Sequence, residues 1–362
     1  MGYFLPRIEM MDGYTPGEQP TEPGVVKLNT NENPYPPSPH VLEAIARVTG
    51  EQLRRYPDPM GNLFRDTAAR MFGVAREMVI CGNGMDDLLN IAVRAFSGPE
   101  AKLVYPTPTY TLYAVLANIQ ASMVKEVPFG PNYELPIDEI VAERGRVTYL
   151  ANPNAPSGTL VPSEQVAALA KRLDGVLCVD EAYVDFSDED CMHLAKRFDN
   201  VLVMRTLSKG YSLAGLRFGF AVGHADLIAG LLKVKDSYNV DAVAIAAAAA
   251  AIRDVDYARS TWEKVRAERV RLAAALAALD MPALPSQANF LLARPSWAPA
   301  RQVYESLKDR RILVRYFSYP RVSDCLRITV GTPEQNDTLL AALTELRAGS
   351  GTAVCDEARL RS

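Results

Sequence analysis

TLSKGYSLAGLRFGFAVG, residues 206 to 223, connects two apolar runs, each of which predicts a short buried strand. The first run ends in two hydroxyl residues and a lysine, Thr206, Ser208 and Lys209, and Arg217 follows further on. A lysine held just past a strand end, among groups that bind anions, suits covalent capture of a phosphorylated aldehyde as an imine. Most lysines instead face solvent or lie near a helix end, so this interpretation needs support from the rest of the chain.

Short apolar runs alternate with helical segments from about Val41 onward. Continuous apolar strands separated by helices predict a buried, mainly parallel sheet with helices on both faces, which is an α/β fold. Residues 254–279 favour one long helix, which we expect to link the large domain to a smaller α+β domain. The predicted division is an N-terminal arm with part of the small domain at 1–40, a large cofactor-binding domain at 41–253, a linking helix and C-terminal small domain at 254–347, and a flexible tail at 348–362.

Composition narrows the class of protein. A chain of 362 residues exceeds the usual size of one hydrophobic core, and its 48% hydrophobic and 23% charged residues are typical of a globular protein. The net charge of −4 argues against nucleic acid or an anionic membrane as a partner, so we expect small-molecule ligands. The sequence shows no signal-peptide pattern and no long apolar run, which predicts a cytoplasmic protein. Five widely spaced cysteines and three histidines predict neither a disulfide framework nor a metal site.

A buried carboxylate is predicted where VDEAYVDF follows the apolar residues of a strand. Asp180 ends this strand and Tyr183 follows three residues later. Burying a carboxylate is costly unless a cation meets it, and a protonated pyridine nitrogen is such a cation. A phenol such as Tyr183 could donate to the phenolate oxygen of the same ring. The alternative is a structural aspartate in a strand-to-helix turn, with Glu181 as its exposed neighbour.

Further segments offer groups that complement such a ring. Asn152, in LANPNAPSGT, could donate to the ring oxygen, and Tyr110, in PTPTYTLY, could stack on the ring. CGNGMDDLLN is a Gly-rich turn that opens a helix, where free backbone amides bind phosphate. Arg327, in DCLRITVGT, could hold a carboxylate through two parallel hydrogen bonds. Each signal is weak alone, but their order along one chain makes chance agreement improbable.

Taken together, these motifs resemble the fold-type I, class-II pyridoxal-phosphate-dependent aminotransferases, and within them the histidinol-phosphate aminotransferase family. The resemblance covers about residues 5 to 345. It implies an α/β large domain with a mainly parallel sheet between helices, and a smaller α+β domain. It also implies pyridoxal 5′-phosphate as cofactor and reversible amino transfer between L-histidinol phosphate and 2-oxoglutarate by a ping-pong mechanism, as a step of histidine biosynthesis. A homodimer with shared active sites is expected.

By this resemblance, Lys209 holds the cofactor as a Schiff base and later moves the proton between the substrate Cα and the cofactor. Asp180 pairs with the pyridine nitrogen, Asn152 and Tyr183 contact the ring oxygen, and Tyr110 stacks on the ring. The implied phosphate ligands are the backbone amides of Met85 and Asp86, the hydroxyls of Thr206 and Ser208, and the guanidinium of Arg217.

The residues expected to bind the substrate follow from the same resemblance. Tyr14 in GYTPGEQP and Asn33 in LNTNENPYPPSP are expected near the substrate, and Arg315 near its phosphate. Arg327 is expected to take the substrate α-carboxylate or the carboxylate of 2-oxoglutarate. Tyr56 in RRYPDP matches the family tyrosine that reaches the cofactor phosphate of the neighbouring subunit.

The chain also departs from the family pattern. Gly13 replaces the usual proline before the arm tyrosine, and Ala155 and Ser157 stand where asparagine and threonine are commoner. Residues 85–87 replace a Ser-Asp-Glu-like triplet. These departures bear on substrate choice, so an aromatic amino-acid aminotransferase and a decarboxylase of a phosphorylated amino acid, such as threonine phosphate, remain alternatives.

Two interpretations from other classes fit the sequence less well. A nucleotide-binding oxidoreductase would share the alternating strands and helices, but the chain lacks a GxGxxG fingerprint at a first strand. It would also leave Lys209 and Asp180 without roles. A non-catalytic regulator on the same fold would need a separate DNA-binding module, for which a chain of this length has no room.

Overall fold

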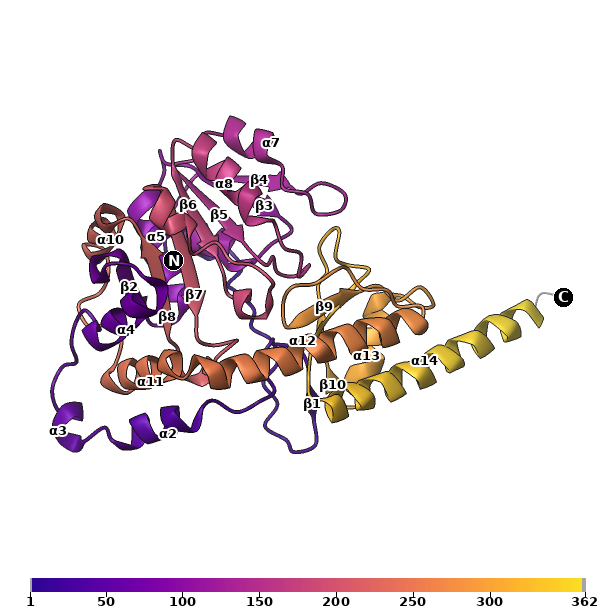
Figure 1. Cartoon of the computed structure of the whole chain (residues 1–362). Coiled ribbons are helices and arrows are strands. Elements are labelled where there is room, and N and C mark those ends of the chain that lie inside the picture. Colours follow the sequence, from indigo (N-terminus) through magenta and orange to yellow (C-terminus); the bar gives the residue numbers. More distant parts are fainter. Residues whose placement is uncertain (1, 360–362) are drawn as a thin grey trace.

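The structure, a computed structural model, describes residues 2–359, with side chains for residues 2–349. A seven-stranded sheet forms the centre of the large domain (Figure 1). In spatial order its strands are β2 (Val79–Gly82), β8 (Gly219–Gly223), β7 (Val201–Thr206), β6 (Val176–Asp180), β5 (Val147–Ala151), β3 (Leu103–Thr107) and β4 (Val124–Pro128). Within this sheet β8 runs against its neighbours and the other adjacent pairs are parallel. The predicted mainly parallel sheet is therefore confirmed.

Helices cover both faces of this sheet, because successive residues of a strand point to opposite sides. In β2, Ile80 packs on one side, whereas Val79 and Cys81 pack on the other. The first side is covered by α5 (Met85–Phe96), α6 (Leu112–Ile119) and α10 (Ala225–Leu232). The second is covered by α4 (Asn62–Phe72), α7 (Ile137–Ala142), α8 (Ser163–Arg172), α9 (Leu194–Arg197) and α11 (Ala242–Arg253). Burial on both sides explains why the strands are apolar along most of their length.

The small domain contains a three-stranded antiparallel sheet. Its strands, in order, are β11 (Arg315–Tyr316), β12 (Leu326–Thr329) and β9 (Phe290–Ala293). Residues near the N-terminus complete this domain, because β1 (Val26–Lys27) pairs in parallel with β10 (Ile312–Leu313). Two helices, α13 (Ala300–Asp309) and α14 (Pro333–Arg359), pack against these strands.

Helix α14 continues through Arg359, whereas the sequence predicted a flexible tail from residue 348. The segment after residue 347 contains no proline, which would break a helix, and its two glycines, Gly349 and Gly351, weaken a helix without ending it. Figure 1 shows the end of α14 projecting away from the body of the molecule. Residues 360–362 lie outside the described part of the chain.

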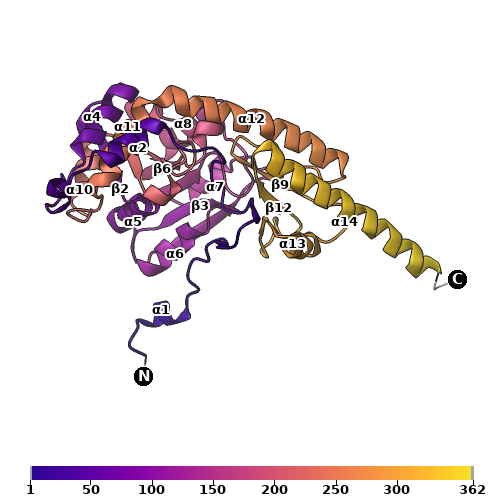
Figure 2. The same cartoon turned by 90° about the horizontal axis from the view of Figure 1, so that it is seen from below.

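One long helix, α12 (Val255–Ala278), runs from the large domain to the small domain (Figure 1). Arg269 on α12 donates hydrogen bonds to the carbonyl oxygens of Phe186, at 3.0 Å, and Ala288, at 2.8 Å, and so ties both domains to the helix. The short helices are α1 (Pro6–Met10), α2 (Pro39–Ala46), α3 (Gly50–Leu53) and the 3₁₀ turns η1 (Arg76–Met78), η2 (Val184–Phe186) and η3 (Ala214–Leu216). Figure 2 shows α1 extending away from the domains. None of the described helices is both long enough and apolar enough for a membrane crossing.

The carboxyl ends of the parallel strands form the edge that faces the small domain. Asp180, the last residue of β6, is in register with Ala151 of β5 and Met204 of β7. Ligands of open α/β sheets bind outside this edge, where the loops after the strands diverge. The polar residues that follow β5, β6 and β7 therefore meet in one place.

Candidate active site

A cavity of about 340 Å³ lies at this edge, between the two domains. Most residues that the sequence predicted for a site line it together. These are Tyr14, Met85, Asp86, Tyr110, Asp180, Tyr183, Thr206, Ser208, Lys209, Arg217, Arg315 and Arg327. They come from the arm, from the helix after β2, from the ends of three strands and from the small domain, so the fold rather than any local segment creates the site.

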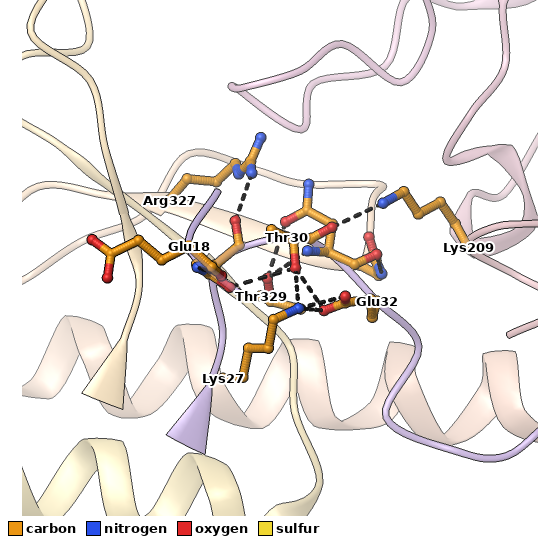
Figure 3. Close-up of polar contacts among 10 residues, drawn as sticks. Glu18, Lys27, Thr30, Glu32, Lys209, Arg327 and Thr329 are labelled. Carbon is orange, nitrogen blue, oxygen red and sulfur yellow. Dashed lines mark hydrogen bonds and ion pairs between the residues drawn. The ribbon is translucent and has the colours of Figure 1, made fainter. Parts of the chain in front are cut away.

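The Lys209 side chain points from the end of β7 toward the segment that precedes α2 (Figure 3). Its Nζ donates a hydrogen bond to the carbonyl oxygen of Thr30 at 2.8 Å. Burial, assisted by the positive charges of Arg327 and Arg217, lowers the pKa of Lys209 to about 8. A lysine with this pKa provides neutral amine near physiological pH, which is the form that attacks an aldehyde.

Asp180 lies at the bottom of the cavity and is only 3% exposed. Its carboxylate accepts a hydrogen bond from the Tyr113 hydroxyl at 2.6 Å and another from the Ala182 amide at 3.1 Å. Burial raises the pKa of Asp180 from its usual 3.8 to about 6, although both hydrogen bonds act in the opposite direction. A buried carboxylate with a raised pKa is poised to pair with a cation that a ligand supplies.

An anion-binding cradle lies at the start of α5. The helix begins at Met85 without a side-chain cap, so its first backbone amides are free to bind a ligand. Arg217 lies against this turn and donates to Asp86 at 3.1 Å. The approach is so close that a Cβ on Gly84 would lie 2.6 Å from the Arg217 guanidinium. Ser208 lies within reach of the same guanidinium, at 3.5 Å.

Two guanidinium groups face the cavity from the small domain. Arg315 of β11 and Arg327 of β12 are paired directly in register. Arg327 donates to the carbonyl oxygen of Asn29 at 2.9 Å, and its buried Nε has no hydrogen-bond partner among the described residues. Arg315 donates to the carbonyl oxygens of Thr15, at 3.0 Å, and Pro16, at 3.3 Å. The cavity can therefore hold two anionic groups on its small-domain side.

Comparison with known proteins identifies the family. The sequence profile described as aminotransferase class I and II matches residues 23–343. The chain belongs to this family. A histidinol-phosphate aminotransferase 1 of Trichormus variabilis is 50% identical over 345 residues, which cover 95% of this chain and 99% of that relative. The protein of the same name from Nostoc sp. is 51% identical, with coverage of 95% and 98%.

A solved structure supports the fold and the cofactor. Histidinol-phosphate aminotransferase from Sinorhizobium meliloti, in complex with pyridoxal-5′-phosphate, matches with a TM-score of 0.87 at 27% identity, over 96% of this chain and 98% of that one. The predicted fold-type I architecture, the aminotransferase class and the cofactor are thereby confirmed. The site of this aminotransferase also fits pyridoxal 5′-phosphate, because a reactive amine, a buried carboxylate and a phosphate cradle surround one cavity.

The structure places the side chain of Asn152 away from the cavity. Its amide nitrogen donates to the carbonyl oxygen of Val161 at 2.9 Å, and its amide oxygen accepts from the Val161 amide at 2.8 Å. Both ends of the side chain are used inside the turn, so Asn152 does not line the cavity of the aminotransferase. The side chain of Ala155 lines it instead and offers no hydrogen bond.

Asn33, which was also expected near the substrate, has its side-chain contacts elsewhere. Its amide donates to the Gly210 carbonyl oxygen and to the Thr261 hydroxyl, both at 3.1 Å, and it lies outside the cavity lining. Asn33 therefore anchors the backbone next to Lys209 rather than contacting substrate. Asn31, two residues earlier, lines the cavity. The sequence offered no means of choosing between these two asparagines, because both lie in the same NTNEN segment.

Tyr56 also lies outside the cavity of its own chain. Its side chain is 80% exposed and stacks on Tyr238, with ring centroids 4.5 Å apart.

Two further cavity residues, Phe317 and Tyr319, were not predicted. They follow Arg315 closely in the sequence, and that proximity was the one available signal.

Replacing Asp180 tests the charge balance of the cofactor-free aminotransferase. The raised pKa corresponds to on the order of 3 kcal/mol of disfavoured charge at neutral pH. Since the folded pKa lies above the unfolded one, this cost is small below pH 4, grows as the pH rises from about 4 to 6, and stays constant above that range. We therefore expect Asp180→Asn to raise the melting temperature at pH 7.5 more than at pH 4.5, and to weaken cofactor binding.

Tyr113→Phe is the matched control, because it removes a donor from Asp180 but keeps the carboxylate. It should lower the melting temperature at pH 7.5, which is the opposite sign. Equal changes at both pH values for Asp180→Asn would contradict the assignment.

Proposed function

We propose that this chain transfers the amino group of L-histidinol phosphate to 2-oxoglutarate, reversibly and by a ping-pong mechanism. The in-register pair of Arg315 and Arg327 carries the proposal. One substrate bears a phosphate and the other bears two carboxylates, so each needs cations at a distance from the reacting nitrogen. The full-length relatives, which are named as histidinol-phosphate aminotransferases, support this assignment.

Each side chain contributes a separate step to this chemistry. Bound pyridoxal 5′-phosphate supplies an electron sink that allows the substrate Cα–H bond to break. Asp180 would keep the pyridine nitrogen protonated, because its carboxylate is buried and, among the described residues, its hydrogen-bond partners are the Tyr113 hydroxyl and the Ala182 amide, neither of which is a cation. Lys209, at its Nζ, would take the proton from the substrate Cα and hold it for return. The first amides of α5, with Arg217, hold the phosphate and so fix the ring in the cavity.

The aromatic lining favours a flat heterocycle on the substrate. Tyr14, Phe317 and Tyr319 line the cavity around Arg315. These rings provide faces on which an imidazole can stack, while Arg315 meets the phosphate. A phenylalanine-type substrate would use the same rings but would leave Arg315 without an anion. For this reason the aromatic amino-acid aminotransferase is the second candidate and not the first.

We also infer that the active form is a homodimer with shared sites. Leu53, Tyr56, Leu63 and Tyr238 are large apolar side chains that remain exposed in one chain. Exposed apolar patches of this kind are typical of protein interfaces. A partner that covers this patch would bring Tyr56 to a second active site, consistent with the family pattern of its RRYPDP segment.

Lys209→Ala tests the cofactor linkage. The purified protein, saturated with cofactor, should show the visible absorption band of an imine, and this band should be lost in the variant because, among the described residues, Lys209 is the only lysine that lines the cavity. Lys233→Ala, which removes an exposed lysine of the large domain, should keep the band. A band that persists in Lys209→Ala would refute the assigned linkage.

Arg315→Gln tests the substrate. For histidinol phosphate, kcat/KM should fall roughly 10- to 100-fold, the equivalent of about 1.5–3 kcal/mol for a lost charged hydrogen bond. For phenylalanine, kcat/KM should change little. The exposed Arg301 provides a matched control, and Arg301→Gln should change neither value. A wild-type preference for phenylalanine would overturn the histidinol-phosphate assignment.

Mixing two inactive variants tests the shared site. In a dimer of Lys209→Ala with Tyr56→Ala, one site combines an intact Lys209 with the intact Tyr56 of the other chain. Random mixing should restore about one quarter of the wild-type activity, because half of the dimers are mixed and each holds one intact site of two. If Tyr56 acts within its own chain, no activity returns.

A further inference from the structure

We propose that Asn31 is a positioning residue: it directs the hydroxyl proton of Tyr183 into the cavity and so lowers the basicity of the imine formed at Lys209. The inference rests on the proposed function, together with the role that the family resemblance implies for Tyr183, namely donation to the ring oxygen of the cofactor. The sequence alone did not show which residue orients the Tyr183 hydroxyl; in the structure this residue is Asn31.

The contact itself is direct. The Asn31 amide nitrogen donates to the Tyr183 hydroxyl oxygen at 3.0 Å. Among the described residues, no acceptor is found for the proton of this hydroxyl, and Tyr183 lines the cavity. With a lone pair occupied by Asn31, the hydroxyl keeps its proton for a ligand.

The orientation of the Asn31 amide follows from Thr329. The Thr329 hydroxyl, on β12, accepts from the Asn31 backbone amide at 3.0 Å. Its own proton is then free to donate, and it meets the Asn31 side-chain oxygen at 3.0 Å. Because the oxygen of the amide is fixed on Thr329, its nitrogen must face Tyr183. The Asn31–Tyr183 contact therefore has one direction.

The backbone holds Asn31 in place. Asn31 is 1% exposed and has a φ of 56°, in the left-handed region that asparagine tolerates better than most residues. Its carbonyl oxygen accepts from Asn289 at 2.9 Å. The preceding residue, Thr30, is the one whose carbonyl oxygen holds Lys209 (Figure 3). Asn31 thus belongs to a fixed segment that passes between Lys209 and the small domain.

In this chain, donation of a hydrogen bond to the ring oxygen depends on Tyr183. The cavity wall contributed by the turn after β5 consists of Ala151, Ala155 and Pro156, and none of these side chains donates a hydrogen bond. Asn152 is turned away from the cavity. Donation to the ring oxygen from this side therefore falls to Tyr183.

The hydrogen bond from Tyr183 is expected to lower the imine pKa. A donor to the ring oxygen draws charge from it and weakens its pairing with the protonated imine, so the imine pKa falls. A hydroxyl that itself accepts from Asn31 is a stronger donor, because linked hydrogen bonds polarise one another. In agreement, the hydrogen bond from Asn31 acts to lower the pKa of Tyr183, against the larger rise that burial causes.

Asn31→Asp is the decisive variant, since it preserves shape and backbone preference but replaces the donor by an acceptor. The Tyr183 proton should turn toward the new carboxylate and away from the cofactor. The imine pKa, measured by absorbance titration of the cofactor-loaded protein, should rise by roughly one unit, about as much as in Tyr183→Phe.

A double-mutant cycle separates this effect from the added negative charge, which would also raise the imine pKa. In the Tyr183→Phe background, Asn31→Asp should cause a clearly smaller shift, because only the effect of the added charge remains. An equal shift in both backgrounds, or none in either, would overturn the proposal. Thr329→Val, which frees the Asn31 amide to rotate, should give a smaller rise that also depends on the Tyr183 hydroxyl. If Asn31→Asp does not fold, Thr329→Val is the test that replaces it. An unchanged imine pKa in Thr329→Val would then count against the proposal.

The titration needs bound cofactor but no substrate. Failure of histidinol phosphate as a substrate would leave the outcome of the cycle intact. Absence of any imine band in the wild-type protein would instead refute the proposed function, and the role of Asn31 with it.

Discussion

Three consecutive residues, Asn29 to Asn31, bind the groups on which this active site depends. The carbonyl oxygen of Asn29 accepts from Arg327, the carbonyl oxygen of Thr30 accepts from Lys209, and the side chain of Asn31 donates to Tyr183. The segment follows β1, which is part of the small domain, and passes across the carboxyl edge of the large sheet. Because one short segment contacts all three side chains, a shift of the small domain relative to the large one changes the surroundings of Lys209 and of Arg327 together.

Burial destabilises the charged forms of Asp180 and Lys209 when no ligand is bound. Asp180 has a raised pKa and Lys209 a lowered one, and desolvation is the largest cause in both cases. Each group is thus shifted toward its neutral form, which is a cost to the folded protein that a cofactor with a cationic ring nitrogen and an aldehyde relieves. The same desolvation that weakens the cofactor-free protein makes the amine nucleophilic and the carboxylate a strong partner, so stability and reactivity are opposed at these two positions.

The sequence predicted the fold and most of the cofactor site because the relevant residues stand next to strand ends, where local patterns are readable. Lys209, Asp180 and the turn before α5 are of this kind. It failed where a long-range contact decides the direction of a side chain. Asn152 faces the wrong way because Val161 binds both ends of its amide, and Asn31 was overlooked because its partner Thr329 lies at the other end of the chain. Tyr113, the donor to Asp180, was missed for the same reason.

The pairing of Arg315 with Arg327 extends this reasoning to the substrate. Like charges directly opposite each other on neighbouring strands destabilise a sheet unless something neutralises them. Backbone carbonyl oxygens do so here, from Thr15 and Pro16 of the N-terminal arm for Arg315 and from Asn29 for Arg327. A phosphate or carboxylate that binds either arginine competes with these carbonyl groups for the same donors. An anion bound at either arginine would therefore disturb the arm that carries Tyr14 or the segment whose carbonyl oxygen accepts from Lys209.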